Sequence, residues 1–127
     1  MSERAKPGTI TWTDLTVENA EEVRDFYAAV VGWKPEAVPM GEYEDYSMNE
    51  SHSGRAAAGI CHARGMNTGL PPQWLLYITV ADIEESLRKC GAHGGKALTE
   101  IRSLGGSGRF CVVRDPAGAV CALFEPA

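Results

Sequence analysis

The sequence predicts an α+β fold made of two copies of one β-α-β-β-β unit. The segment Trp-Thr-Asp-Leu-Thr-Val-Glu-Asn-Ala-Glu-Glu, which begins at Trp12, is similar to Leu-Leu-Tyr-Ile-Thr-Val-Ala-Asp-Ile-Glu-Glu, which begins at Leu75. The offset of 63 residues (75 − 12) is about half of the 127-residue chain, so it indicates two units rather than a solenoid. We predict a single domain, residues 1–127, with repeat units at about 9–65 and 73–127 and a linker at 66–72.

Each unit begins with a strand signal that is followed by a helix signal. Residues 10–17 and 74–80 are rich in β-branched and aromatic side chains. Asn19 and Asp82 are the predicted N-caps, and a Glu three positions later predicts a capping box in both helices. Gly32 and Gly91 are the predicted helix ends. In the first helix, apolar residues at the spacing of a half-buried helix predict an inward stripe of Val23, Phe26, Tyr27, Val30 and Val31.

Three further strand signals follow each helix. They lie near residues 33–38, 44–49 and 55–63 in the first unit, and near 96–101, 109–114 and 119–125 in the second. The sequence Asp115-Pro-Ala-Gly118 is a strong turn signal between the last two strands. Residues 66–72, Met-Asn-Thr-Gly-Leu-Pro-Pro, contain the Gly and Pro residues that are typical of a linker.

Composition excludes several classes of partner. Twelve basic against seventeen acidic residues give a net charge of −5, and no cluster of Lys and Arg provides the basic face that nucleic acids need. The apolar runs are too short to cross a bilayer, and residues 1–8 carry no hydrophobic signal region. We therefore expect a soluble, cytoplasmic protein without a nucleic-acid or membrane partner. The four cysteines form no Cys-x-x-Cys pair and are expected to be reduced.

The pattern resembles the vicinal oxygen chelate superfamily, which includes glyoxalase I, extradiol dioxygenases and bleomycin resistance proteins. The resemblance rests on residues 10–17 with the helix signal at 23–33, on residues 77–85 with Gly94-Gly95, and on residues 114–118 leading into 122–125. It implies a curved, barrel-like mixed sheet around a ligand cleft, and a homodimer. It does not fix a reaction, because this fold serves many chemistries.

The resemblance also implies where a divalent metal would be held. Its four ligand positions correspond here to Trp12, Leu75, Ala122 and either Ala58 or Gly59. None of these side chains can bind a cation, so no cofactor is predicted. A divalent metal is expected only if an atypical set of ligands holds it, namely Asp14 with Cys61 or His62 and Glu125.

Strand parity predicts a mostly apolar, aromatic cleft floor. The candidate ligand-binding residues are Trp12, Asp14, Tyr46, Met48, Cys61, His62, Leu75, Tyr77, Ala122 and Phe124. Cys61 and His62 are adjacent, so only one of them can face the cleft. Asp14 and Cys61 are the candidate catalytic groups if a reaction occurs. The same side chains could instead fill the cleft as core.

Three functions are compatible with these observations. The first is the binding of a small organic molecule without a metal, as in the bleomycin-binding proteins that the chain resembles. The second is a lyase, isomerase or dioxygenase of the same superfamily that uses an atypical metal or acid–base set. The third is a regulatory or structural domain without a small-molecule ligand. The sequence leaves open whether the protein is an enzyme.

Overall fold

The computed structural model describes residues 5–127, apart from the side chain of Met66. Residues 1–4, which begin the segment expected to carry no signal region, lie outside the described residues. The first half of the described chain contains β1 (Ile10–Val17), α1 (Ala20–Val31), β2 (Lys34–Pro39), β3 (Glu44–Asn49) and β4 (Ala56–His62). The second half contains β5 (Trp74–Thr79), α2 (Ile83–Ala92), β6 (Lys96–Ala97), β7 (Arg102–Ser103), β8 (Gly108–Arg114) and β9 (Val120–Pro126). Short 3-10 turns lie at Gly65–Asn67 and Gly105–Ser107.

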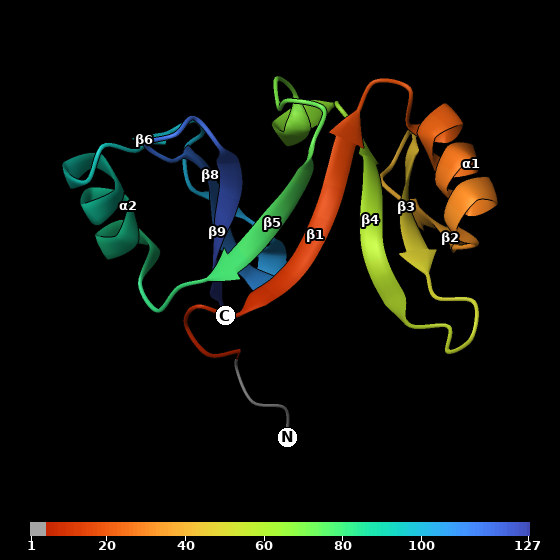
Figure 1. Cartoon of the computed structure of the whole chain (residues 1–127), viewed down its shortest axis with the longest axis horizontal. Coiled ribbons are helices and arrows are strands. Elements are labelled where there is room, and N and C mark those ends of the chain that lie inside the picture. Colours follow the sequence, from red (N-terminus) through yellow and green to blue (C-terminus); the bar gives the residue numbers. More distant parts are fainter. Residues whose placement is uncertain (1–4) are drawn as a thin grey trace. The chain divides into compact units, whose positions relative to one another are not determined.

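The predicted α+β fold with a β-α-β-β-β pattern in each half is confirmed (Figure 1). In the first half the strand order is β2-β3-β4-β1, and β1 runs parallel to β4. In the second half the order is β6-β8-β9-β5, and β5 runs parallel to β9. The two halves therefore share one topology, as the internal repeat predicts.

The chain forms two compact units. One comprises residues 13–74, and the other comprises the residues before 13 together with residues 75–127. The start of β1 belongs to the second unit, where Thr79 donates its backbone N–H to Thr9 at 2.8 Å. The remainder of β1 pairs with β4 in the first unit, from Asp14 opposite Gly59 to Val17 opposite His62.

Each helix packs on one face of the sheet of its own unit. In the 13–74 unit, Ala20 of α1 is buried with Tyr46, Met48 and Ile60. The rings of Tyr27, Trp33 and Trp74 complete this core, and Trp74 Nε1 donates to the Tyr27 hydroxyl at 3.1 Å. In the other unit, Ile83 of α2 is buried against Cys111 and Val113 of β8.

The inward stripe predicted for α1 is correct for only two of its members. Val23 and Tyr27 pack against the core. Phe26, Val30 and Val31 are instead 55%, 66% and 51% exposed. The sheet lies against the sector of α1 that carries Ala20, Val23 and Tyr27, so the other apolar residues of the stripe stay largely exposed.

The helix ends differ between the two units. Asp82 caps α2 as predicted, because its carboxylate accepts the N–H of Glu85 at 3.1 Å. The capping box predicted at Asn19 is wrong: the Asn19 amide donates to the Glu22 side chain and makes no hydrogen bond to the backbone. Gly32 ends α1 with a left-handed φ of 86°, as predicted. Gly91 does not end α2, which runs to Ala92.

The strand predicted at 96–101 is divided into β6 and β7. Thr99, between them, explains the interruption, because its hydroxyl accepts the Val112 N–H at 3.1 Å and donates to the carbonyl of Glu100. A side-chain oxygen thus replaces a backbone carbonyl in the ladder with β8. The chain rejoins the sheet at Arg102, which pairs with Phe110.

Neither helix in the described part of the chain has the length and apolarity needed to cross a membrane.

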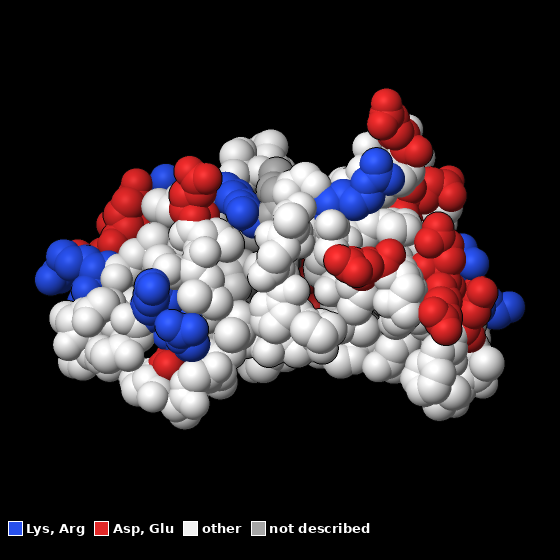
Figure 2. All heavy atoms as spheres, turned by 90° about the horizontal axis from the view of Figure 1, so that it is seen from above, with Lys and Arg blue, Asp and Glu red and all other residues white. Residues whose placement is uncertain are grey.

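Charged side chains of both signs are interspersed on the face shown in Figure 2, with basic groups scattered among acidic ones.

Candidate ligand-binding faces

Strand parity defines two faces of the sheet in each unit. One face packs against the helix. We call the opposite faces the α1-distal face, which carries Asp14, Thr16, Gly59 and Cys61, and the α2-distal face, which carries Tyr77, Thr79, Phe110, Val112, Ala122 and Phe124. Because helices cover the other faces, these two are the candidates for binding a ligand.

The predicted parity of β3 is wrong. Tyr46 and Met48 are buried in the core against α1, and the Arg24 guanidinium of α1 lies 4.7 Å from the centre of the Tyr46 ring. Both side chains therefore point toward the helix, away from the face that carries Asp14 and Cys61. The sequence misses this because strand 44–49 has no partner in the repeat alignment that fixes its register.

His62 also lies on the helix side of its sheet. Its Nε2 is 3.1 Å from Oε1 of Glu21 on α1, and its Nδ1 is 3.4 Å from Oδ1 of Asp45 on β3. The same Asp45 oxygen accepts the His62 backbone N–H at 2.8 Å. The hydrogen bond from His62 holds the pKa of Glu21 below its usual value. His62 thus ties α1, β3 and β4 together, and Cys61 is the member of the pair that faces away from the helix.

Cys61 has little capacity for chemistry at neutral pH. Burial raises the pKa of its thiol strongly, and the nearby carboxylates of Asp14 and Asp45 raise this pKa further. A thiol reacts as a nucleophile only after it loses its proton. Of the two predicted catalytic candidates, only Asp14 therefore carries a group suited to acid–base work.

The α2-distal face is apolar and aromatic. The Tyr77 and Phe110 rings have centroids 5.9 Å apart, and Phe124 lies opposite Phe110 in the register of β8 and β9. Ala122, which pairs with Tyr77, adds no bulk. Leu75, Phe110 and Ala122 are fully buried and Tyr77 is 9% exposed, so among the aromatic side chains of this face only Phe124 is half-buried. The predicted residues Tyr77, Ala122 and Phe124 are therefore brought to one face.

Arg102 at the edge of this face is a residue that the sequence prediction misses. It pairs with Phe110 across β7 and β8. Its Nη1 atom is buried and has no hydrogen-bond partner among the described residues. The sequence prediction misses Arg102 because the strand predicted at 96–101 ends one residue before it.

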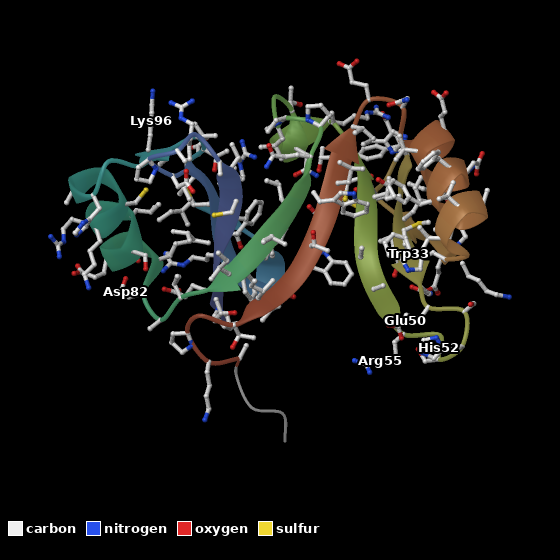
Figure 3. The ribbon with its side chains drawn as sticks, in the orientation of Figure 1. Trp33, Glu50, His52, Arg55, Asp82 and Lys96 are labelled. Atoms are coloured by element: carbon white, nitrogen blue, oxygen red, sulfur yellow. The ribbon has the colours of Figure 1, made fainter. Side chains whose placement is uncertain are left out.

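An acidic group lies at the start of α2. Asp82, Glu84 and Glu125 bring three carboxylates within 4.8 Å of one another (Asp82 is labelled in Figure 3). Arg109 forms ion pairs with two of them, at 2.9 Å from Glu84 and 2.8 Å from Glu125. The second oxygen of Glu125 accepts the Ile83 N–H at 2.9 Å. These bonds hold the pKa of Glu125 below its usual value, first through Ile83 and then through Arg109. Both carboxylate oxygens of Glu125 therefore already accept hydrogen bonds that stabilise the start of α2. Glu125 is poorly suited to bind a metal ion together with Asp14 and Cys61 or His62, as the atypical set requires.

Three surface hollows lie elsewhere in the units. One of about 380 Å³ lies at the ends of β1 and β4 and is lined by residues 16–19, Ala63, Gly69, Leu70 and Pro72. Another of about 380 Å³ lies beside the end of α2, and a third of about 260 Å³ lies near Pro7 and Pro126. None of the ten predicted ligand-binding residues lines any of these three. Glu50 and His52 form an ion pair within the β3–β4 turn (Figure 3), with His52 Nε2 3.6 Å from Glu50 Oε1.

A sequence model of one family matches residues 9–123. The chain belongs to the Glyoxalase/Bleomycin resistance protein/Dioxygenase superfamily. The resemblance inferred from the sequence motifs is thereby confirmed.

Two curated proteins are similar to the chain in sequence. The Mycobacterium tuberculosis protein named "Putative glyoxylase CFP32" is 31% identical over 94% of the chain, which covers 45% of that protein. The anthracycline biosynthesis protein DnrV of Streptomyces peucetius is 25% identical over 96% of the chain and is 48% covered. The chain thus spans about half the length of these curated relatives.

Solved structures share the fold at low sequence identity. Methylmalonyl-CoA epimerase from Mycobacterium tuberculosis has a TM-score of 0.58 and 17% identity, covering 100% of this chain and 93% of its own. A glyoxalase superfamily member from Vibrio splendidus also has a TM-score of 0.58, with 14% identity, covering 90% of this chain and 96% of its own.

The structure resolves the fourth metal-ligand position that the superfamily resemblance implies. Tyr77 pairs with Ala122 in one unit, and Asp14 pairs with Gly59 in the other. Both members of the second pair lie 63 residues before those of the first (77 − 14 and 122 − 59), so Gly59 is the twin of Ala122, and Ala58 is not. The side chains at the four positions offer no nitrogen, oxygen or sulfur lone pair that is suited to a divalent cation. The residues there are Trp12, Gly59, Leu75 and Ala122. The residues at these positions therefore do not fit the metal of the superfamily.

Proposed function

We propose that this chain binds a small organic molecule on an apolar, aromatic face of its sheet and does so without a metal ion. The observation that supports this most directly is the α2-distal face. There Tyr77, Phe110 and Phe124 gather in a glyoxalase superfamily fold whose implied metal positions carry no donor atoms. Aromatic and apolar side chains with few polar groups are the usual lining of small-molecule sites.

The names of the relatives keep an enzymatic alternative in view. A glyoxylase and an epimerase are both enzymes by name. In such a function Asp14 would be the acid–base group, because the raised pKa of Cys61 keeps its thiol protonated at neutral pH. A homodimer also remains a prediction.

The proposal is tested by measuring bound metal and bound ligand on the same preparation. The purified, untagged protein is incubated with Ni²⁺, Zn²⁺, Mn²⁺ or Fe²⁺ and desalted, and the metal content is measured by elemental mass spectrometry. We expect far less than one equivalent of any metal. A panel of small aromatic molecules should raise the melting temperature of the same metal-free protein, since a ligand that binds only the folded state stabilises it.

Two outcomes contradict the proposal. Retention of about one equivalent of a single metal would show that the ligand positions are wrongly assigned and would favour the enzymatic alternative. A panel that leaves the melting temperature unchanged at millimolar concentration would contradict small-molecule binding.

A further inference from the structure

We propose that the hollow beside α2 is a separate ligand site, which binds an acyl chain that ends in a carboxylate. This hollow of about 380 Å³ lies between α2 and the strands β8 and β9. It is on the side of the sheet that α2 covers, and all of its lining belongs to one unit. The inference therefore goes beyond the proposed function and does not depend on it.

The hollow exists because two core-facing positions of α2 carry small side chains. Ser86 and Cys90 follow the buried Ile83 by three and seven residues, the spacing of one helical face, and both line the hollow. The 63-residue repeat places them at the positions of Val23 and Tyr27 in the first unit. There the larger side chains pack against the core, and neither of them lines any of the three hollows. The second unit thus leaves open a space that the first unit fills.

The floor of the hollow is apolar and only partly covered. Val113 and Leu123 pack on the α2 side of the sheet, and Val80 lies just before the helix. Val80 and Leu123 remain half-buried although both pack against the cluster around Ile83. An apolar chain that covered them would remove apolar surface from water, which favours binding.

Basic groups line the part of the hollow near the end of α2. Lys89 and His93 are one helical turn apart and both line it. The Lys89 ammonium is 3.9 Å from Glu85, a carboxylate that Arg88 binds more closely, so its charge is only weakly paired. Asp115 brings a carboxylate to the same part, but its Oδ1 atom accepts two backbone N–H groups of its own turn, at 2.8 and 3.0 Å. The cation available to a ligand is therefore Lys89, and it suits a carboxylate.

The arrangement gives the ligand a length and a direction. Ser86 and His93 are seven residues apart, which corresponds to about 10 Å along α2. Val80 precedes the helix and His93 follows it, so the apolar and the basic parts of the lining lie toward opposite ends. A short acyl chain with its carboxylate near Lys89 matches the hollow in length, polarity and charge.

Filling the hollow tests whether it is the site. The affinity of octanoate is measured by calorimetry for the native chain, Ser86→Leu and Ala92→Leu. The first substitution places a leucine in the hollow, and the control places one at an exposed position of α2 that lines none of the hollows. We expect Ser86→Leu to weaken octanoate binding at least tenfold and Ala92→Leu to leave it unchanged. Equal affinities of the native chain and Ser86→Leu, or no binding to the native chain at millimolar concentration, would overturn the inference.

Removing one charge tests the assignment of the carboxylate. The native chain should bind octanoate several-fold more tightly than octan-1-ol. Lys89→Gln should remove this preference and leave the affinity for the alcohol unchanged. Arg88→Gln, a change at an exposed arginine that does not line the hollow, should preserve the preference. Equal binding of octanoate and octan-1-ol to the native chain would contradict the carboxylate end of the ligand.

The thiol of Cys90 reports on the place of binding without any substitution. It lines the hollow and is half-buried, so a bound chain should shield it. The rate of Cys90 alkylation by iodoacetamide is followed by peptide mass spectrometry, with Cys61 of the other unit as the internal control. Saturating octanoate should slow the reaction of Cys90 at least threefold and leave that of Cys61 unchanged. An unchanged rate at Cys90 would overturn the inference even if Ser86→Leu failed to fold.

Discussion

At the scale of single residues, Gly108 shows how tightly the α2-distal face is built. It opens β8 with a φ of 137°, which side chains other than hydrogen rarely tolerate. A Cβ at this position would collide with the Glu125 carbonyl oxygen and lie 3.1 Å from Cε1 of Phe124. Only glycine allows β8 and β9 to approach here, and the position of the Phe124 ring depends on that approach.

We expect Gly108→Ala to lower the free energy of unfolding by about 2 kcal/mol or more, because it adds backbone strain to a clash with backbone atoms. Urea denaturation followed by circular dichroism measures this. Gly106→Ala is the control, since a Cβ there meets nothing within 4 Å, and it should change stability by less than about 0.5 kcal/mol. Equal effects of the two substitutions would show that the close approach at Gly108 is not present in solution.

At the scale of elements, the two helices begin in different ways although their sequences repeat. The N-terminus of α2 receives two carboxylates: Asp82 accepts the N–H of Glu85, and Glu125 of β9 accepts the N–H of Ile83. The N-terminus of α1 receives no side-chain cap from Asn19. It is fastened instead through Glu21 to His62 of β4. The same sequence signal therefore supports a local cap in one unit and a tertiary contact in the other.

This difference predicts unequal effects of alanine at the two matched positions. Asp82→Ala should lower the free energy of unfolding by about 1 kcal/mol, the usual loss when an N-cap is removed. Asn19→Ala should have a smaller effect, because it removes only an exposed hydrogen bond between side chains. Denaturant unfolding of both variants decides the point. A larger loss for Asn19→Ala than for Asp82→Ala would contradict the assigned caps.

At the scale of the whole molecule, several of the acidic side chains are stabilised in their charged form by hydrogen bonds to nearby residues. Five glutamates have pKa values below the usual 4.5, and in each the largest cause is one hydrogen bond. The donors are His62 for Glu21, Ser53 for Glu50, Arg109 for Glu84, Arg88 for Glu85 and the backbone N–H of Ile83 for Glu125. A carboxyl group whose folded-state pKa is lowered contributes stability that is present above the unfolded-state pKa and is lost as the pH falls through the folded-state value.

The melting temperature should therefore fall steadily as the pH is lowered from about 5 toward 3, across the window that begins at the unfolded-state pKa of 4.5. Scanning calorimetry across this range measures the effect. Arg109→Gln should flatten part of the profile, because Glu84 and Glu125 lose their main cationic partner. The carboxylates of Glu21, Glu84 and Glu85 are exposed to solvent, so high salt should weaken their part of the same dependence. A melting temperature that stays constant or rises on acidification would contradict this account.

The sequence by itself determined the elements of the fold and their repetition. Strand 10–17 and strand 44–49 were predicted with the bounds that the structure has, and so was the capping role of Asp82. These features depend on interactions within a few residues, namely side-chain alternation and hydrogen bonds at helix ends, which the local sequence specifies. The repeat then supplied the topology, because two similar segments form similar units.

Only the tertiary structure decided which side of each strand is covered. Alternation separates two sets of side chains but does not say which set a helix covers, and a shift of one residue inverts the assignment. For this reason Tyr46 and Met48 were assigned to the wrong face, whereas Tyr77, Ala122 and Phe124 were brought together as expected. The break at Thr99 and the return of the chain at Arg102 depend on hydrogen bonds to β8, about ten residues away in sequence. The position of Arg102, whose Nη1 atom has no hydrogen-bond partner among the described residues, results from that pairing, and no local pattern in the sequence predicts it.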